Sequence, residues 1–304
     1  MTCVIDFLNV GFGEATVIRY TYGDRSFCLV VDGGDVHAST NIRRCSLTQY
    51  IREQHIEKID VLVLTHFHRD HIGGVHEIIG RVPIGEIKIH LTLPEFILET
   101  GMMDCSTPML ASLSLYIQIL NMAKELNIPV DVVERSTAFY EQELTYKLLM
   151  PEMHKLQQLK LELNDLDMSC LKGQAESLNR IDRMLSSTAM AVIISYKGES
   201  VVLLTSDVSL DFWVPYCGEL TNIAVVQAPH HGDQHRISGE WLSSINPQAV
   251  IVSADDRGTY QLPHKEIEAI ISEHSNAQLY YTEAAATTHR ILRVDAQQCS
   301  VEFI

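Results

Sequence analysis

The sequence lacks any long apolar run, and this absence argues against two locations for the protein. No apolar stretch in the 304 residues approaches the length that a membrane-spanning helix needs. Residues 1–14 also lack a basic segment followed by a continuous apolar one, which is the pattern of a secretory signal. We therefore expect neither insertion into a membrane nor secretion.

Closely paired cysteines are absent as well. The seven cysteines are odd in number and scattered along the chain, at positions 3, 28, 45, 105, 170, 217 and 299. Such a pattern is typical of a protein in a reducing compartment rather than of a disulfide framework. We expect a cytoplasmic location.

Basic residues are few, and no segment concentrates them. The formal net charge is −16, with no long basic stretch, no Lys/Arg run interleaved with aromatic residues and no phosphate-binding loop of the P-loop type. Such a surface repels a polyanion, so non-specific binding to long nucleic acid is disfavoured. Bound metal ions can reverse the local field, which leaves a small or locally held phosphodiester open as a substrate.

What the sequence does contain is enough apolar residues for a substantial core, since 46% of its residues are hydrophobic. Strand-like runs alternate with helical patterns in both halves, and the middle third has long Leu- and Met-rich helical spacing. Residues 108–126 and 152–185 show this spacing most clearly. We predict a single domain over residues 1–304, a layered α/β or α+β sandwich with a mainly helical insertion at about 95–185.

One short segment carries an unusual density of metal-binding side chains. His66, His68, Asp70 and His71 lie within six residues, directly after the apolar run 59–64 and before Gly73. Neutral imidazole and carboxylate groups suit zinc, manganese or iron. The alternative is a polar loop with chance histidines, but the preceding strand and following glycines are the context that a metal-binding loop requires.

Three further polar positions also follow strand-like runs. They are His230 with His231 after residues 223–227, Asp207 after residues 201–204, and Asp32 after residues 26–31. Alone, the histidine pair is equally consistent with a surface loop, and each aspartate with a turn or helix cap. Together with the first cluster, they predict a shared site in which Asp207 bridges two cations and Asp32 orients a ligand or the ion-bound water.

The order of these motifs resembles the metallo-β-lactamase superfamily, most closely the branch that contains the soluble domain of the bacterial DNA-uptake protein ComEC. The resemblance rests on Asp32-Gly33-Gly34, residues 65–74, Leu204-Thr205-Ser206-Asp207 and Pro229-His230-His231-Gly232, and extends to residues 7–15 and to the stretch from Ser253 to His264. It covers nearly the whole chain except about 95–185. It implies a four-layer αβ/βα sandwich with the metals at one edge between the two sheets.

The resemblance also implies a ligand set. His66 and His68 would bind the first metal, Asp70 and His71 the second, and Asp207 would bridge them. His230, ahead of His231, would complete the second site. His264 would be a further ligand, a proton donor or a phosphate contact. The cofactors would be two divalent ions, zinc or manganese, with iron as a third choice.

Two positions depart from the superfamily pattern. Many members supply a third histidine to the first metal from a loop before the bridging aspartate, but residues 185–189 here read Leu-Ser-Ser-Thr-Ala. The nearest upstream histidine is His154, which we expect on a helix surface. Ser206 also stands where the ComEC-type branch commonly has glycine. The first site is therefore expected to be the weaker one.

The resemblance implies a hydrolase that uses a water or hydroxide between the two metals. Asp70 or Asp32 would accept the proton, and His264 or solvent would protonate the leaving oxygen. Since the branch includes nucleases and phosphodiesterases, we expect a phosphodiester in DNA, RNA or a nucleotide-like molecule as substrate. Hydrolysis of a thioester, lactone or lactam is the second alternative. The absence of the third histidine and the absence of an export signal both disfavour it.

A different class of function is also open, namely an inactive effector or binding subunit of a larger complex. Apolar residues in the middle third would then form a helix that faces a protein partner: Met109, Leu113, Leu115, Ile119, Leu120 and Met122. Such a stripe more often belongs to the core. Metal-dependent turnover that His68→Ala abolishes would favour the enzyme.

Overall fold

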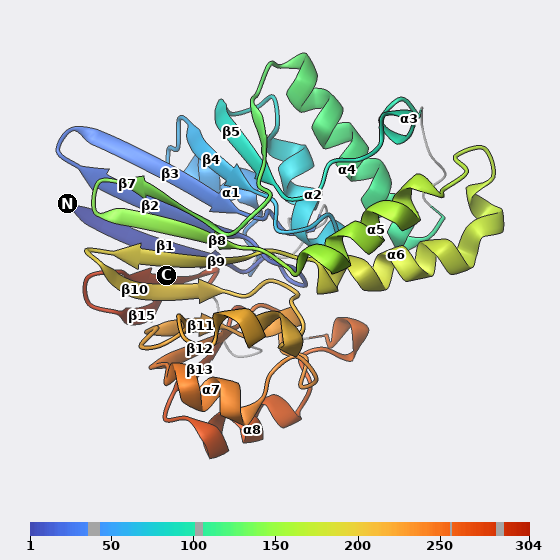
Figure 1. The fold of residues 1–304 in the computed structure, drawn as a ribbon. Coiled ribbons are helices and arrows are strands. Elements are labelled where there is room, and N and C mark those ends of the chain that lie inside the picture. The colour runs from blue at the N-terminus through green and yellow to red at the C-terminus, as the bar shows by residue number, and fades with distance from the viewer. Residues whose placement is uncertain (36–42, 101–105, 256, 284–288) are drawn as a thin grey trace.

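The computed structural model describes residues 1–35, 43–100, 106–255, 257–283 and 289–304 (Figure 1). These residues form two mixed β-sheets. The first has the strand order β15 (Ser300–Phe303), β14 (Ile291–Asp295), β1 (Thr2–Leu8), β2 (Thr16–Tyr22), β3 (Arg25–Val31), β4 (Ile59–Val63), β5 (Ile84–Ile89) and β6 (Val130–Val132). The second has the order β13 (Gln278–Tyr281), β12 (Ala249–Val252), β11 (Val225–Gln227), β10 (Glu199–Leu204), β9 (Ala191–Tyr196), β8 (Leu144–Leu149) and β7 (Thr137–Glu141).

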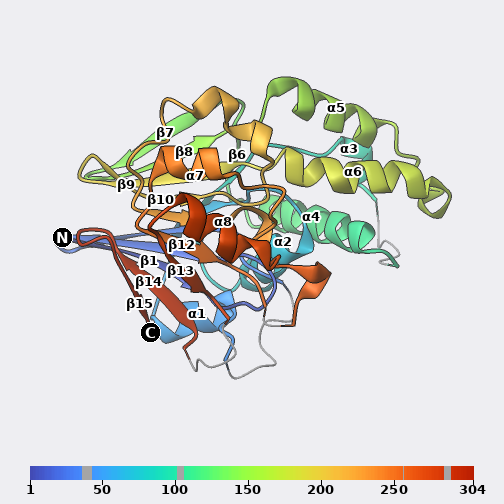
Figure 2. The same cartoon turned by 90° about the horizontal axis from the view of Figure 1, so that it is seen from below.

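Helices cover the outer face of each sheet. The helices packed on the first sheet are α1 (Leu47–Glu53), α2 (Arg69–Ile78), α3 (Glu95–Leu98), α4 (Pro108–Glu125), α5 (Met153–Asn164) and α6 (Ala175–Ser187). Those on the second are α7 (Gly239–Ile245) and α8 (Glu266–His274), of which α8 lies over β12 and β13 in Figure 2. The inner faces of both sheets share one apolar core, to which Ile5, Val192 and Ile251 contribute. The layers are therefore helix, sheet, sheet and helix, and the predicted αβ/βα sandwich is confirmed.

Parallel strand pairing determines where the polar motifs meet. β3, β4 and β5 are parallel in the first sheet, and β10 to β13 are parallel in the second. Ligands bind at the carboxyl ends of strands in such sheets because several strands deliver their following loops to the same edge. Asp32 follows β3, His66 follows β4, Asp207 follows β10 and His230 follows β11. The sheets thus bring distant segments to one edge.

The glycine pairs predicted beside the histidine cluster let α2 pack against the end of β3. A Cβ on Gly74 would lie 2.0 Å from the carbonyl oxygen of Gly33, which is far inside van der Waals contact. The backbone N–H of Gly33 donates to the carbonyl of His71 at 2.6 Å, and that of Gly74 donates to Gly34 at 2.9 Å. This close approach holds the first turn of α2 next to Asp32.

The predicted mainly helical insertion at about 95–185 is wrong for its central part. Helices α3 to α6 lie within it, but β6 extends the first sheet, and β7 and β8 extend the second. Residues 130–149 therefore belong to the sandwich. A strand as short as β6, whose sequence is Val-Asp-Val, has too few residues to give a clear periodic signal. The single-domain organisation stays a prediction.

The apolar stripe of α4 lies in the core and not at a partner surface. Met109, Leu113, Ile119 and Leu120 are buried, and Leu115 and Met122 pack against the same cluster. The helix has apolar residues over most of its circumference because α2, α3 and α6 surround it. The suggested partner-facing helix is therefore wrong for this stripe.

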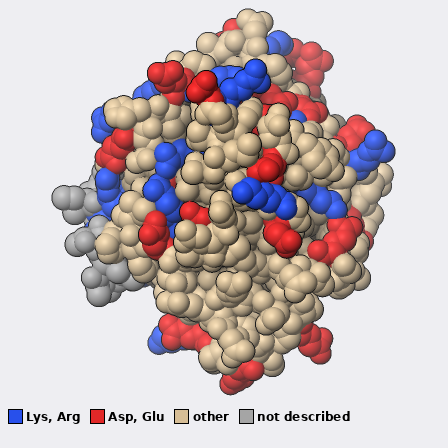
Figure 3. All heavy atoms as spheres, turned by 90° about the vertical axis from the view of Figure 1, so that its left-hand side faces the viewer, with Lys and Arg blue, Asp and Glu red and all other residues tan. Residues whose placement is uncertain are grey.

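The described residues include no helix that is long and apolar enough to span a membrane. On the face shown in Figure 3, Lys and Arg side chains stand among Asp and Glu and form no continuous basic surface.

His90, directly after β5, is a buried titratable group with consequences for stability. Its side chain is 3% exposed, and neither ring nitrogen hydrogen-bonds to the described part of the chain. Burial, reinforced by Lys160, lowers the pKa of His90 from 6.5 to about 3. Between these values the unfolded chain binds the extra proton, so the free energy of unfolding falls as the pH drops from about 6.5 towards 3.

We expect His90→Leu to reduce this acid sensitivity by about 1.4 kcal/mol per pH unit. The measurement is urea denaturation at several pH values across the window. His154→Leu is the control, because the side chain of His154 is 62% exposed. If His90→Leu and the parent protein lose stability at the same rate, His90 is not the group responsible.

Candidate metal centre

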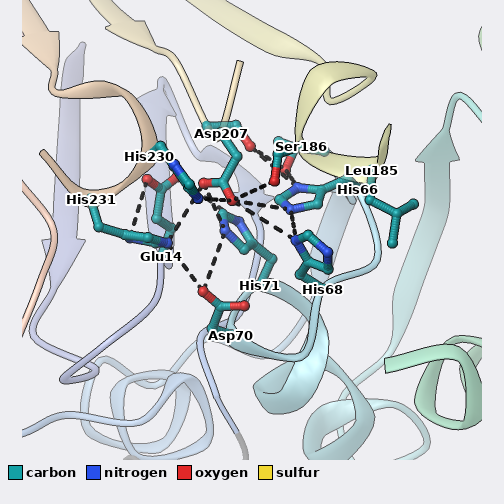
Figure 4. Close-up of polar contacts among 12 residues, drawn as sticks. Glu14, His66, His68, Asp70, His71, Leu185, Ser186, Asp207, His230 and His231 are labelled. Carbon is teal, nitrogen blue, oxygen red and sulfur yellow. Dashed lines mark hydrogen bonds and ion pairs between the residues drawn. The ribbon is translucent and has the colours of Figure 1, made fainter. Parts of the chain in front are cut away.

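Seven of the predicted site residues come together at the edge where the strands of both sheets end (Figure 4). His66 lies in the loop after β4, and His68 is the N-cap of α2. Asp70 and His71 occupy the first turn of that helix. Asp207 arrives from β10, and His230 and His231 lie in the 3₁₀ turn η4 (Pro229–His231) after β11.

Asp207 lies at the centre, with its two oxygens directed to different imidazoles. Its Oδ2 is 3.4 Å from His66 Nε2 and 4.0 Å from His68 Nδ1. Its Oδ1 is 3.2 Å from His71 Nε2 and 3.6 Å from His231 Nε2. The side chain is 2% exposed. One carboxylate therefore contacts two separate sets of candidate ligands.

The second set consists of Asp70, His71 and His231 with Oδ1 of Asp207. Asp70 Oδ2 lies 3.1 Å from His231 Nε2 and 3.9 Å from His71 Nε2. His71 Nε2, His231 Nε2 and Asp207 Oδ1 are all buried and accept or donate no hydrogen bond among the described residues. Leaving a buried polar atom unsatisfied costs about 1–3 kcal/mol. Three such atoms around one point fit a divalent cation.

The first set is less complete. His66 Nε2 and His68 Nδ1 lie 3.0 Å apart and face Oδ2 of Asp207. At the position of the missing third histidine, Ser186 Oγ lies 3.5 Å from the same oxygen. His154 is exposed on α5 and pairs with Glu152, as expected for a surface residue. Imidazole, carboxylate and hydroxyl groups here still form a donor set that a cation could use.

Of the two adjacent histidines, His231 and not His230 lies in the second set. His231 Nε2 lies with Asp70 in the second set, whereas His230 Nε2 lies 3.6 Å from Asp207 Oδ2, on the side of the first set. The expectation that His230 comes before His231 in the second site is therefore not supported. The reason is the backbone: both residues have positive φ, 50° and 58°, which no sequence pattern indicates.

Hydrogen bonds fix the ring orientations of the second set. Asp32 Oδ2 accepts from His71 Nδ1 at 2.8 Å, and the Ser253 carbonyl accepts from His231 Nδ1 at 2.9 Å. Each ring nitrogen Nε2 is then left with a lone pair for a cation. Asp32 also accepts from the Thr65 backbone N–H and hydroxyl, at 2.9 and 2.7 Å. Asp32 is 1% exposed and is not among the residues that line the cleft of about 660 Å³ beside the centre, so its contacts are with His71 and Thr65.

His264 lies outside the candidate ligand groups. Its Nδ1 accepts from the Gln234 backbone N–H at 3.1 Å and lies 3.2 Å from Asp233 Oδ1. Because Nδ1 accepts this hydrogen bond, the neutral ring carries its proton on Nε2. His264 also lines the cleft beside the centre. Its position therefore agrees with a proton donor or an anion contact rather than with a metal ligand.

Several residues of the centre were not identified from the sequence. Glu14 is buried, with Oε1 3.8 Å from His231 Nδ1 and Oε2 4.0 Å from His71 Nδ1. Asp182, from α6, lies 3.4 Å from His68 Nε2, and Asp233 lies 3.1 Å from His230 Nδ1. The only sequence signal for Glu14 was its turn between two strands, and single aspartates on a helix or in a loop carry none.

Ionisation within the centre is governed by burial and by the density of charge. Burial alone would lower the pKa of His68 and His231, but neighbouring carboxylates outweigh it and raise both to about 9. Burial raises the pKa of Glu14 to about 8. For Asp207, the nearby imidazoles overcome burial and hold its pKa well below the usual range. The carboxylates therefore favour positively charged neighbours. With no metal bound, protonated imidazoles provide this charge.

Backbone strain is concentrated at the same place. Asp32, Ser206, His230 and His231 have φ values of 57°, 50°, 50° and 58°. Non-glycine residues in this region cost about 1–3 kcal/mol each and persist where the surroundings demand them, often at functional sites. The positive φ of Ser206 is a conformation that glycine adopts without strain, which fits the glycine that the resemblance implies at this position. Its hydroxyl contacts Thr65 Oγ1 at 2.8 Å, which gives the serine a compensating bond.

Comparisons with known proteins identify the fold family. A family model described as the metallo-beta-lactamase superfamily matches residues 8–135. The chain is 19% identical over 283 residues to ComE operon protein 3 of Bacillus subtilis (strain 168), which covers 89% of this chain and 31% of that protein. The chain therefore spans about a third of the length of this curated relative.

Solved structures share the fold at low sequence identity. A mutant of CmlA, a β-hydroxylase from Streptomyces venezuelae, has a TM-score of 0.50 at 13% identity, with 96% of this chain and 54% of that chain covered. Igni18, a metallo hydrolase from Ignicoccus hospitalis KIN4/I, has a TM-score of 0.49 at 15% identity and covers 91% of this chain and 94% of its own. The predicted resemblance to the metallo-β-lactamase superfamily is confirmed.

We expect Asp32→Asn to lower the affinity for zinc by about 10- to 100-fold, because the amide cannot accept from both Thr65 and His71. Competition with a chromogenic chelator measures this affinity. Asp60→Asn is the matched control, since Asp60 accepts from the Cys28 backbone N–H on the same sheet but away from the centre. Equal zinc affinity in Asp32→Asn and the parent would show that Asp32 does not orient a ligand.

Proposed function

Since residues 8–135 carry the metallo-β-lactamase superfamily domain, we propose that the protein is a metal-dependent hydrolase that acts on a phosphodiester. The observation that carries the proposal is the position of Asp207 between two sets of candidate ligands, of which the second has buried, unsatisfied ligand atoms. A centre of this kind is what binuclear hydrolytic chemistry requires.

In this proposal Asp70, His71 and His231 hold one cation, and His66 and His68 hold the other, with Asp207 shared. His230 completes the first set in place of the missing histidine, because its Nε2 lies 3.6 Å from Asp207 Oδ2. Zinc or manganese suits these donors, with iron as the third choice. Bound divalent cations would act as Lewis acids that lower the pKa of water and stabilise negative charge on the substrate.

Asp70 and His264 would carry out the proton transfers. Asp70 lines the cleft and Asp32 does not, so of the two carboxylates predicted to accept a proton, Asp70 keeps this role. His264 would donate a proton from Nε2 to the leaving oxygen, with the Gln234 backbone N–H fixing its ring through Nδ1. Asp182 would position His68 through Nε2.

Support for an anionic substrate comes from the cleft, which has a volume of about 660 Å³. Five arginines line it: Arg44, Arg69, Arg183, Arg236 and Arg257. Six aspartates line it as well, among them Asp70 and Asp207 of the centre. With cations bound to these two carboxylates, the arginines would favour a phosphodiester over a neutral thioester, lactone or lactam. Guanidinium groups match the geometry of phosphate oxygens. A cytoplasmic location and a protein partner for segment 95–185 stay predictions.

The test is hydrolysis of bis(p-nitrophenyl) phosphate with added manganese or zinc. We expect metal-dependent release of p-nitrophenolate, and a loss of at least about 100-fold in kcat/KM for His68→Ala, because a ligand of the first cation is gone. His76→Ala is the control on the same helix, where His76 contacts Gln118 away from the cleft. Circular dichroism confirms that both variants are folded.

No metal-dependent hydrolysis by the parent protein would contradict the proposal. So would a His68→Ala variant as active as His76→Ala. Either result would favour an effector or binding subunit.

A further inference from the structure

The cleft beside the metal centre has an aromatic wall that the hydrolytic proposal leaves unexplained. Tyr260 lines the cleft with 68% of its surface exposed. Its ring meets Phe12 edge-on at 5.2 Å between centroids, and Phe12 lies 4.4 Å from the His231 ring. An aromatic series thus leads from a candidate metal ligand to a ring that is open to the cleft.

The loop that carries Tyr260 is held in a strained conformation. Tyr260 and Gln261 have φ values of 54° and 64°, a region that bulky residues rarely adopt. Asp255 fixes the start of the loop by accepting from the Thr259 backbone N–H and hydroxyl, at 3.1 and 2.6 Å. Leu262 anchors its end, since it is 5% exposed. The strained backbone therefore holds a large aromatic ring in solvent. Burial of this ring cannot explain why the strain is retained.

Two of the cleft arginines are available for a ligand. Arg69 pairs with Asp35, Arg44 with Glu283, and Arg236 lies 3.7 Å from Asp233. By contrast, Arg183 on α6 and Arg257 after β12 make no hydrogen bond or ion pair within the described ranges of the chain, and both are exposed. They reach the cleft from different elements, one from the helices on the first sheet and one from the loop that carries Tyr260.

We propose that this cleft binds a nucleotide, with Tyr260 stacking on the base and Arg183 and Arg257 contacting phosphate oxygens. This inference rests on the proposed phosphodiesterase function and narrows its substrate to a phosphodiester that carries a base. Stacking between a base and an aromatic ring contributes about 1–3 kcal/mol and accepts any base, since every base has a π face. Guanidinium groups bind phosphate oxygens in a bidentate manner.

The ligand is a short phosphodiester such as a dinucleotide rather than a long strand, and a mononucleotide represents one half of it. The net charge of −16 repels an extended polyanion, and the cleft of about 660 Å³ matches the size of a small-molecule site. A short ligand can contact Arg183 and Arg257 without lying along the rest of the acidic surface.

The test is equilibrium binding by calorimetry of the purified protein with AMP, ribose 5-phosphate and adenosine, which requires no turnover. We expect AMP to bind more tightly than either fragment. Tyr260→Ala should weaken AMP by about tenfold while leaving ribose 5-phosphate unchanged, and Tyr260→Phe should behave as the parent. Arg257→Gln and Arg183→Gln should weaken AMP and ribose 5-phosphate but not adenosine.

Two exposed residues elsewhere provide controls. Tyr140→Ala removes an aromatic ring on β7 that is 76% exposed, and Arg52→Gln removes an exposed arginine on α1. Neither lines the cleft, so neither should change the affinity for AMP.

The inference is overturned if AMP does not bind, if it binds no more tightly than ribose 5-phosphate, or if Tyr260→Ala leaves its affinity unchanged. Tighter binding of single-stranded oligoadenylate than of AMP would contradict a small ligand. Metal-dependent hydrolysis of bis(p-nitrophenyl) phosphate, together with an AMP affinity that Tyr260→Ala leaves unchanged, would leave the proposed function standing and remove this inference. Tyr260-dependent binding of AMP without hydrolysis would do the reverse.

Discussion

The constraint on which the rest of this structure depends is the burial of ionisable groups around Asp207. Glu14, Asp32, Asp70 and Asp207 all lie within 4.0 Å of an imidazole nitrogen, and most of these side chains are almost inaccessible to water. Removing charges from water is costly unless opposite charge compensates them nearby. The imidazoles supply part of this compensation, and their raised pKa values in His68 and His231 show how strongly the carboxylates demand it.

Many local features of the fold serve to hold this cluster together. The parallel strands deliver its members to one edge, and the close contact between Gly33 and Gly74 seats α2 against Asp32. The positive φ values of Ser206, His230 and His231 turn side chains inward at the ends of β10 and β11. Such strain is tolerated where the surroundings over-determine the backbone, and the buried charge network provides that over-determination.

Much of the centre is predictable because its residues follow apolar runs that are easily recognised. His66 was expected from the dense histidine cluster after β4, and Asp207 after β10 from its strand end taken together with that cluster, since parallel strands deliver their loops to the same edge. The order of His230 and His231 was not predictable, because it depends on consecutive left-handed residues. Glu14, Asp182 and Asp233 were missed since a single acidic residue in a turn or helix has many structural uses. The strands at residues 130–149 were missed because they are short and lie among longer helical patterns.

The central claim is that Asp207 joins two cation sites, and elemental analysis of the purified protein tests it most directly. The account predicts about two transition-metal ions per chain in the parent, and a clear loss of both in Asp207→Ala, because each set loses one of its ligand atoms. One ion or none in the parent after manganese or zinc is supplied would contradict it. An Asp207→Ala variant that retains the full metal content would do so as well.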